Sequence, residues 1–399
     1  MSELLSIEQA RSRILGRVRP LPAERIPLEE ANGRVLAESA RAAVDLPPFP
    51  SSAMDGFAVR VSDLPGRLPI VGRIAAGRPA DRPLRAGEAM AIATGGVVPD
   101  GADAVVPVEA TVVHDDNIVE VSDGVAAGAH VRPRAGDVEA GARVVPAGTR
   151  LGPGQLGALA AAGIAEVVCS VRPQASVLTT GTELRRPGEP LEPGQIYEAN
   201  GLVIEAQLAG AGAEVERLVA VEDTETAHRT AIERGLEADV LVTSGGVSVG
   251  AHDLVRRVEA GLGVEEVFWR VAVKPGKPTS FGVRGDTLVF GLPGNPVSSL
   301  VTCELFVRPA VEALQGLVDP GPHFRIGTLA APTGRNPQRD ELARARARVT
   351  DDGVVLELLR GQESHMIAQA AEANALVLIP AGDGTVESGT PMRYLELGL

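Results

Sequence analysis

Five segments of the chain carry residue types that hold anions and metal ions, and each directly follows an apolar run. They are TTGTEL (179–184), EDTET (222–226), TSGGVSVGAHD (243–253), KPGKP (274–278) and GLPGNPVSS (291–299). All five carry hydroxyl, carboxylate or lysine side chains, and all except EDTET combine them with glycine or proline. In an open parallel sheet, ligands bind beyond the carboxyl ends of the strands, where such turns gather. Together the segments predict one binding crevice.

Glycines and hydroxyls in two of these segments suit an oxyanion such as phosphate. Glycine leaves backbone N–H groups open to a ligand, and the loop concerned contains Ser244, Gly245, Gly246, Ser248 and Gly250. In GLPGNPVSS, Asn295 is a good N-cap and Pro296 a good first helical residue, so a helix N-terminus should face the same crevice. A flexible surface turn and a purely structural cap are the alternatives.

Lysines and carboxylates supply charge at the same strand ends. Lys274 and Lys277 each directly precede a proline, so their ammonium groups are offered from a rigid segment, although a solvated pair is the alternative. Glu183, Asp223 and Asp253 would together hold Mg²⁺, which favours oxygen ligands plus substrate phosphate. Taken singly, each could be an ordinary surface acid.

Two motif matches are misleading. GPGQLG (152–157) fits GxGxxG, but it contains Pro153, and no acid ends a strand about 20 residues later, so we expect no dinucleotide site. GVSVG (246–250) fits the GxSxG of serine hydrolases, yet it forms a loose glycine loop instead of the sharp turn such a nucleophile needs. His323 and His365 could be bases, but both fall in the C-terminal domain.

The elements that must position these residues differ along the chain. A capping box and helical spacing predict a helix over 6–18, and Pro153 at a first helical position with Gly163 just past the end predicts a short helix between them. From 46 to about 137, dense Gly and Pro with short β-branched runs predict a strand-rich insertion. From 174 to about 316, strands and helices alternate, which favours a parallel sheet covered on both faces. From 320 onward, short strands predict a small all-β domain.

The insertion has polar, rigid loops of its own. PPFPSSAMDGFAVR (47–60) places Ser52 and Asp55 on an exposed turn after a stiff, proline-rich lead-in. A later glycine-rich turn offers Thr94, and Asp137 lies beside two arginines. Loops of this kind on a separate domain would suit the second wall of a cleft.

Composition limits the partners and the compartment. A chain of 399 residues predicts about two to four domains. Only 3% of residues are aromatic and the net charge is -14, which argues against nucleic acid and anionic membrane as partners. Cys169 and Cys303 give neither a disulfide framework nor a metal knuckle. With no apolar leader and no stretch long enough to span a membrane, a cytoplasmic protein is expected.

A series of segments resembles the molybdopterin molybdenumtransferases, bacterial relatives of the gephyrin E-domain. In the family's order they read SAMDGFAVR, ATGG with VPDGADAVV, RAGDVEAG, LTTGTEL with GQIYEANG, TSGGVSVGAHD, VKPGKP and GLPGNPVSS. The resemblance covers essentially the whole chain and implies an α/β multidomain fold. The implied parts are a mixed α/β domain (1–45 plus 138–173), a β-rich insertion domain (46–137), a central doubly wound molybdenum-cofactor-binding α/β domain (174–318) and a small C-terminal β-barrel-like domain (319–399).

The activity implied by the resemblance is insertion of molybdate into adenylated molybdopterin, with Mg²⁺-dependent release of AMP. Lys274, Lys277 and Ser298 would hold the molybdate dianion. Asp223 and Asp253 would hold Mg²⁺. The other implied substrate-binding residues are Ser244, Gly245, Gly246, Ser248, Gly250, Gly294, Asn295, Pro296, Arg339 and Arg344. The implied catalytic residues are Asp55, Thr94, Asp137, Glu183 and Asp253.

The resemblance also implies an elongated homodimer in which Asp55 and its neighbours reach the crevice of the other protomer. Transient contacts with the adenylyltransferase and with recipient apoenzymes are implied in the same way. One departure is TGTEL where many members read TGDEL, so Thr182 replaces a carboxylate and a metal role there is in doubt. A related molybdopterin adenylyltransferase and a non-catalytic, gephyrin-like scaffold remain alternatives, and molybdate is not distinguished from tungstate.

Overall fold

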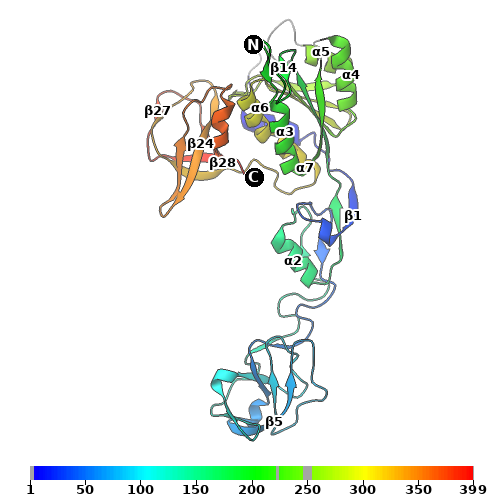
Figure 1. The fold of residues 1–399 in the computed structure, drawn as a ribbon, viewed down its shortest axis with the longest axis vertical. Helices are drawn as coiled ribbons and strands as arrows, with labels where there is room; N and C mark the ends of the chain where they lie inside the picture. The colour runs from blue at the N-terminus through cyan, green and yellow to red at the C-terminus, as the bar shows by residue number, and fades with distance from the viewer. Residues whose placement is uncertain (1–3, 222–223, 246–253, 399) are drawn as a thin grey trace.

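The fold is drawn out along one axis, with a large body at one end and a small domain at the other (Figure 1). The computed structural model describes residues 4–221, 224–245 and 254–398. Among these residues, no helix combines the length and the apolar character needed to cross a bilayer. The four domain ranges expected above stay a prediction, and the elements are described here sheet by sheet.

A six-stranded sheet forms the centre of the large body, in the order β16-β13-β17-β21-β20-β18. Four strands run parallel: β13 (Gln174–Thr180), β16 (Glu214–Val221), β17 (Val240–Ser244) and β21 (Thr287–Leu292). The other two are β18 (Glu265–Trp269) and β20 (Ser280–Arg284), and β20 is antiparallel to both neighbours. The α/β prediction is confirmed, but the sheet is mixed because a tight turn joins β20 directly to β21, and so short a connection allows only antiparallel pairing.

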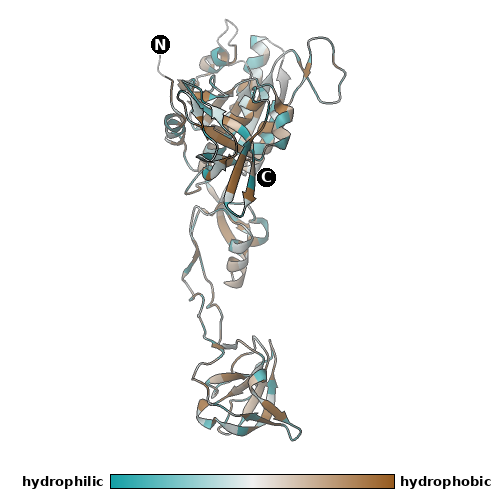
Figure 2. Cartoon of the chain, turned by 90° about the vertical axis from the view of Figure 1, so that its left-hand side faces the viewer, coloured by the Kyte–Doolittle hydropathy of each residue, from teal (hydrophilic) through white to brown (hydrophobic). Residues whose placement is uncertain are grey.

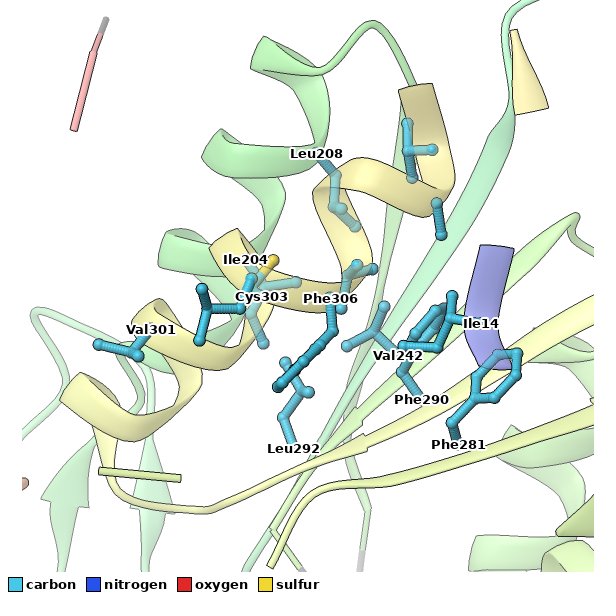
Figure 3. Packing of buried hydrophobic residues seen from close by; sticks show 14 of the residues in the cluster. Ile14, Ile204, Leu208, Val242, Phe281, Phe290, Leu292, Val301, Cys303 and Phe306 are labelled. Carbon is cyan, nitrogen blue, oxygen red and sulfur yellow. The ribbon is translucent and has the colours of Figure 1, made fainter. Parts of the chain in front are cut away.

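Helices cover both faces of this sheet. They are α3 (Asn200–Gly210), α4 (Glu225–Gly235), α5 (Leu254–Gly261), α6 (Pro296–Thr302) and α7 (Arg308–Leu314), with a π-helical segment at Cys303–Val307. Along β17, Val240 and Val242 face one hydrophobic cluster and Leu241 faces the other. Because side chains alternate between faces, a strand buried on both sides needs a continuous apolar run. Figure 3 shows the first cluster, in which Phe290 and Phe306 pack between sheet and helices.

The N-terminal helix completes that cluster. It is α1 (Ile7–Leu15), and Ser6 forms the predicted capping box with Gln9. Chain segments on either side of the insertion then pair with each other: β1 (Ala23–Pro27) with β12 (Glu166–Ser170), and β2 (Ala40–Arg41) with β11 (Arg143–Val145). Helix α2 (Pro153–Ala161) covers them and starts at the predicted proline.

The insertion is a curled, six-stranded half-barrel in the order β7-β4-β6-β5-β9-β8. Its strands are β4 (Gly56–Val59), β5 (Gly66–Ile74), β6 (Ala89–Ile92), β7 (Ala104–Pro107), β8 (Val112–His114) and β9 (Ile118–Val121). A short pair, β3 (Ser51–Ser52) with β10 (Val131–Arg132), ties its loops together. Hydrophobic residues follow the strands here as they do in the large body (Figure 2).

The C-terminal region is a closed five-stranded barrel, as expected. Its strands are β22 (Arg325–Leu329), β24 (Asp340–Thr350), β25 (Gly353–Leu358), β26 (Ala375–Ile379) and β28 (Pro391–Glu396). The ring closes because the long strand β24 pairs with both β25 and β26. On its edge lies β19 (Val273–Lys274), which belongs to the KPGKP segment. The barrel is therefore joined to the strand ends of the α/β sheet. The remaining short pairs are β14 (Leu184–Arg185) with β15 (Ile196–Tyr197), and β23 (Thr333–Gly334) with β27 (Thr385–Val386).

Candidate functional site

A cavity of about 720 Å³ lies at the carboxyl ends of β13, β17 and β21. This is the edge at which an open α/β sheet binds its ligands. Six of the predicted residues lie on its wall: Glu183, Ser244, Gly245, Gly294, Asn295 and Pro296. Other parts of its wall come from Asn200 at the start of α3, from Pro278, and from His365 and Ile367 of the C-terminal region.

Hydrogen bonds around Ser244 join the turns that form the cavity. The Asn200 side-chain amide donates to Ser244 Oγ at 2.9 Å and to the Gly294 carbonyl at 2.7 Å. Ser244 Oγ lies 3.1 Å from Ser299 Oγ. Three segments that are far apart in sequence are therefore fixed relative to one another. Since Ser244 is buried and its hydroxyl already has these partners, it shapes the wall.

One glycine on this edge is required by close approach. Gly245 has φ +98°, and a Cβ there would lie 2.8 Å from the Thr180 carbonyl oxygen. The N–H of Gly245 donates to the Leu292 carbonyl at 3.2 Å. The Gly245 N–H is therefore already hydrogen-bonded, and an oxyanion bound at this loop would need other donors.

Helix α6 starts at the predicted residues, but Asn295 does not make the hydrogen bond expected of an N-cap. Asn295 is the N-cap residue and Pro296 is the first helical residue, yet the Asn295 side chain makes no capping bond. Its amide donates instead to Ser364 Oγ at 2.9 Å, and Val297 N–H donates to the Ser364 carbonyl at 3.1 Å. The turn is thus fastened to the loop that carries His365.

Ser298 and the two lysines do not lie on the cavity wall. Ser298 is buried inside α6. The Lys274 ammonium lies 3.2 Å from the Glu341 carboxylate of β24, so part of its charge is compensated. Lys277 is exposed, and no ion pair is found for it within the described ranges. Pro278 is on the wall, so Lys277 lies at the rim.

The predicted arginines of the barrel behave differently from each other. Arg344 is 1% exposed, and its guanidinium donates to the carbonyl groups of Gly361, Glu363 and Met366 at 2.5, 3.1 and 2.5 Å. Burial lowers the pKa of Arg344. Because these donors point into the loop, Arg344 positions His365 and does not itself reach the cavity. Arg339 is half-buried, and its backbone N–H donates to Asn336 Oδ1 at 3.0 Å.

Two of the insertion's three candidates contact each other. Thr94 donates to one oxygen of the exposed Asp55 carboxylate from its backbone N–H at 2.6 Å and from its hydroxyl at 2.9 Å. These two bonds lower the pKa of Asp55, so the carboxylate is charged near neutrality. Asp137 is exposed, and the nearby Arg134 pairs with Asp45 instead. The insertion lies at the far end of the molecule from the cavity (Figure 1), so these residues do not meet it within one chain.

The predicted metal site cannot be assembled from the described residues. Asp223, Asp253, Gly246, Ser248 and Gly250 lie outside them. Within the described ranges no group of three or more potential ligands is found. Of the two glutamates on the cavity wall, Glu198 accepts the Gly201 N–H at 2.7 Å. Glu183 is exposed and is the oxygen donor that fits a magnesium ion there, but by itself it is too few.

Asn200, Ser364 and His365 were not predicted as site residues. Asn200 falls in GQIYEANG, whose match to the family was a usable signal. His365 falls in the C-terminal domain, but the pairing of β19 with β24 brings the barrel to the cavity. No local pattern distinguishes Ser364, whose role depends on a contact across 69 residues of sequence.

Comparison with protein families matches nearly the whole chain in three parts. Residues 5–163 match the "MoeA N-terminal region (domain I and II)". Residues 176–313 match the "Probable molybdopterin binding domain" and 327–397 the "MoeA C-terminal region (domain IV)". The cavity described above therefore lies mainly on the part that matches a molybdopterin-binding domain.

Individual proteins are similar over the same length. "Molybdopterin molybdenumtransferase 2" of Mycobacterium tuberculosis is 37% identical, with 93% of this chain and 94% of that protein covered. "Molybdopterin molybdenumtransferase" of Haemophilus influenzae is 35% identical, with 97% of each covered. Two solved structures of molybdopterin biosynthesis MoeA protein from Pyrococcus horikoshii have TM-scores of 0.81 and 0.85 at 29% and 26% identity, covering 99% of this chain and 100% of each solved chain.

Proposed function

The chain belongs to the molybdopterin molybdenumtransferase family, and on that basis we propose that it inserts molybdenum from molybdate into adenylated molybdopterin with release of AMP. The observation that carries this is the cavity at the strand ends, which joins Glu183, Asn200 and Asn295 to the barrel residue His365. A cavity of about 720 Å³ is within the usual size of small-molecule sites. The adenylyltransferase alternative is not favoured, because all three family regions are present.

The chain's own residues can bind and orient the substrates. The Asn200 amide fixes two strand ends, so the wall is formed before the substrate arrives. Exposed Lys277 at the rim offers a full positive charge to molybdate, against a net charge of -14 for the chain. The Glu183 carboxylate can accept a proton from the water that hydrolyses the adenylyl bond. Asp223 and Asp253 would hold Mg²⁺, which when bound neutralises phosphate charge.

A homodimer completes the site in this proposal. The Asp55–Thr94 pair is exposed and charged, but it lies far from its own cavity. We therefore place the Asp55 loop of one protomer at the cavity of its partner, which is the kind of reciprocal contact that two-fold symmetry produces. We further propose a cytoplasmic location, Mg²⁺ dependence and transient transfer contacts with the adenylyltransferase and recipient apoenzymes.

AMP release from adenylated molybdopterin tests the activity directly. Wild-type protein should release AMP only when both molybdate and Mg²⁺ are present, and Glu183→Gln should lower the rate without changing the melting temperature. Ser62→Ala on the insertion surface is a matched control and should keep the wild-type rate. ATP consumption without any dependence on molybdate would instead identify an adenylyltransferase. A wild-type rate in Glu183→Gln would remove this residue from the chemistry.

Complementation tests the shared site. Asp55→Asn and Glu183→Gln should each be nearly inactive alone. Refolded together, random mixing of a two-fold dimer should restore about a quarter of the wild-type rate, because half the dimers are mixed and one of their two cavities is intact. The mixed sample should be verified as a dimer by light scattering. If its rate is only the average of the rates of the two variants alone, each cavity uses residues of one chain.

A further inference from the structure

Arg270 occupies an unusual backbone conformation between β18 and β19. Its φ is +80°, and it is one of four non-glycine residues with positive φ in the described ranges. A side chain is disfavoured in this region, and glycine adopts it freely. A strained position that carries a long basic side chain suggests that the side chain has a use.

The Arg270 guanidinium is stacked but otherwise uncommitted. It lies 3.7 Å from the centroid of the Trp269 ring, and the Arg256 guanidinium lies 4.2 Å from the same centroid. Arg256 also donates to the Glu266 carboxylate. For Arg270 the described part of the chain shows no side-chain hydrogen bond and no ion pair. Stacking uses the face of the guanidinium and leaves the N–H donors at its edge available.

The backbone places Arg270 beside the cavity rim. Arg270 N–H donates to the Thr279 carbonyl at 2.8 Å, and Val271 N–H donates to the Lys277 carbonyl at 3.0 Å. Pro278, between these two acceptors, lies on the cavity wall. Strand β18 is antiparallel to β20, which is antiparallel to β21. The end of β18 therefore lies at the same edge of the sheet as the ends of β17 and β21.

We propose that Arg270 binds a tetrahedral oxyanion at this rim together with Lys277. The inference rests on the function proposed above, whose substrates carry two such groups, molybdate and the adenylyl phosphate. A guanidinium can donate two parallel hydrogen bonds to adjacent oxygens of either group. The stack on Trp269 holds the guanidinium plane in place, so little side-chain freedom is lost when the anion binds. Within the described residues no carboxylate pairs with the side chain of Arg270 or Lys277, so the two cations form a local positive region in an otherwise acidic chain.

The only tryptophan of the chain gives a direct readout, because Trp269 touches Arg270. Full-length protein would be titrated with sodium molybdate and, separately, with AMP, while its fluorescence is followed. Wild-type protein should show a saturable change with at least one of them. Arg270→Gln should raise the dissociation constant for that anion roughly tenfold or more, as expected for loss of a charged hydrogen-bond donor. Arg270→Lys should fall between the two.

Arg393→Gln is the matched control, because its guanidinium also stacks on an aromatic ring, 4.3 Å from the Phe324 centroid in the barrel. It should keep wild-type affinity. Arg270→Gly removes the side chain and relieves the backbone, so it should melt no lower than Arg270→Gln and bind the anion equally weakly. Weakening for molybdate alone assigns Arg270 to molybdate, and weakening for AMP alone assigns it to the adenylyl phosphate.

Unchanged affinity for both anions in Arg270→Gln, or no saturable change in wild-type protein, would overturn the inference. AMP release on the same preparations keeps the two proposals separate. Wild-type release with an unchanged KM for molybdate in Arg270→Gln would count against Arg270 alone. Intact anion binding without any AMP release would count against the proposed function.

Discussion

Replacing Arg344 by Met should loosen the loop that brings the barrel to the cavity. The guanidinium is buried and donates to three carbonyl groups of residues 361–366. Its pKa is lowered by burial, and its guanidinium is hydrogen-bonded to backbone carbonyl groups. Met has a similar length and no donors. The substitution therefore removes the hydrogen bonds while leaving much of the volume filled.

The expected loss follows from those three acceptors. A buried carbonyl left without a donor costs about 1–3 kcal/mol, which gives roughly 3–9 kcal/mol if none finds another partner. Glu363 and His365 are exposed, so water can reach part of the loop. Removing a charge that is poorly solvated also returns some free energy. We therefore expect a loss of about 3–4 kcal/mol in the free energy of unfolding of the barrel.

The same strand offers a matched control. Arg346, two residues away, is exposed and pairs with Glu372 at 3.1 Å. Arg346→Met should cost less than about 1 kcal/mol, as exposed ion pairs do. Urea unfolding would measure both variants, and hydrogen exchange of residues 359–367 would locate the change. Equal unfolding free energies, or unchanged exchange of this loop in Arg344→Met, would refute the assignment of Arg344 as the residue that holds it.

Three further substitutions test other contacts. Thr94→Val should raise the pKa of Asp55, which Thr94 holds below its ordinary value through its backbone and side chain; a carbon-13 titration with no change would contradict this. The stability that this lowered pKa confers is present near neutrality and lost as pH falls through it, so the variant should lose less stability in acid. Asn200→Ala should weaken substrate binding severalfold by freeing two strand ends, whereas a wild-type KM would show that the wall holds without it. Burial raises the pKa of Glu304. The stability that the protonated Glu304 carboxyl confers is therefore full in acid and is lost as pH rises through the raised pKa. Glu304→Gln should flatten the melting-temperature profile over this pH range.

Residue patterns predicted the parts of the fold that depend on local chemistry. The capping box at Ser6 and the proline that starts α2 determine helix ends through neighbouring backbone groups, and both appear in the structure. Apolar runs such as that of β17 predicted strands buried on two faces. The antiparallel β20 was not predicted, because the direction of a strand depends on which neighbour it pairs with.

The site was predictable only where strand ends determine it. Glu183, Ser244 and Asn295 lie at or just after the ends of strands of one sheet, so topology alone brings them together. His365 reaches the cavity because β19 pairs with β24, and no residue spacing in the sequence predicts that pairing. Arg344 was wrongly predicted to bind substrate, because its guanidinium donors are already hydrogen-bonded to backbone carbonyl groups.

The connection to the insertion bears on the dimer proposed above, because its contacts hold Asp55 away from the cavity of its own chain. Residues 42–50 and 132–142 form this connection, and they are joined to each other by a bridge between Leu46 and Val138. The Asp45 carboxylate accepts from the Ala140 N–H at 2.8 Å and pairs with Arg134, and these bonds lower its pKa. A loose connection could swing Asp55 toward its own cavity, but a paired one holds it away because bending would break these contacts. The charged Asp55–Thr94 pair is therefore held away from the cavity of its own chain, as the proposed dimer requires.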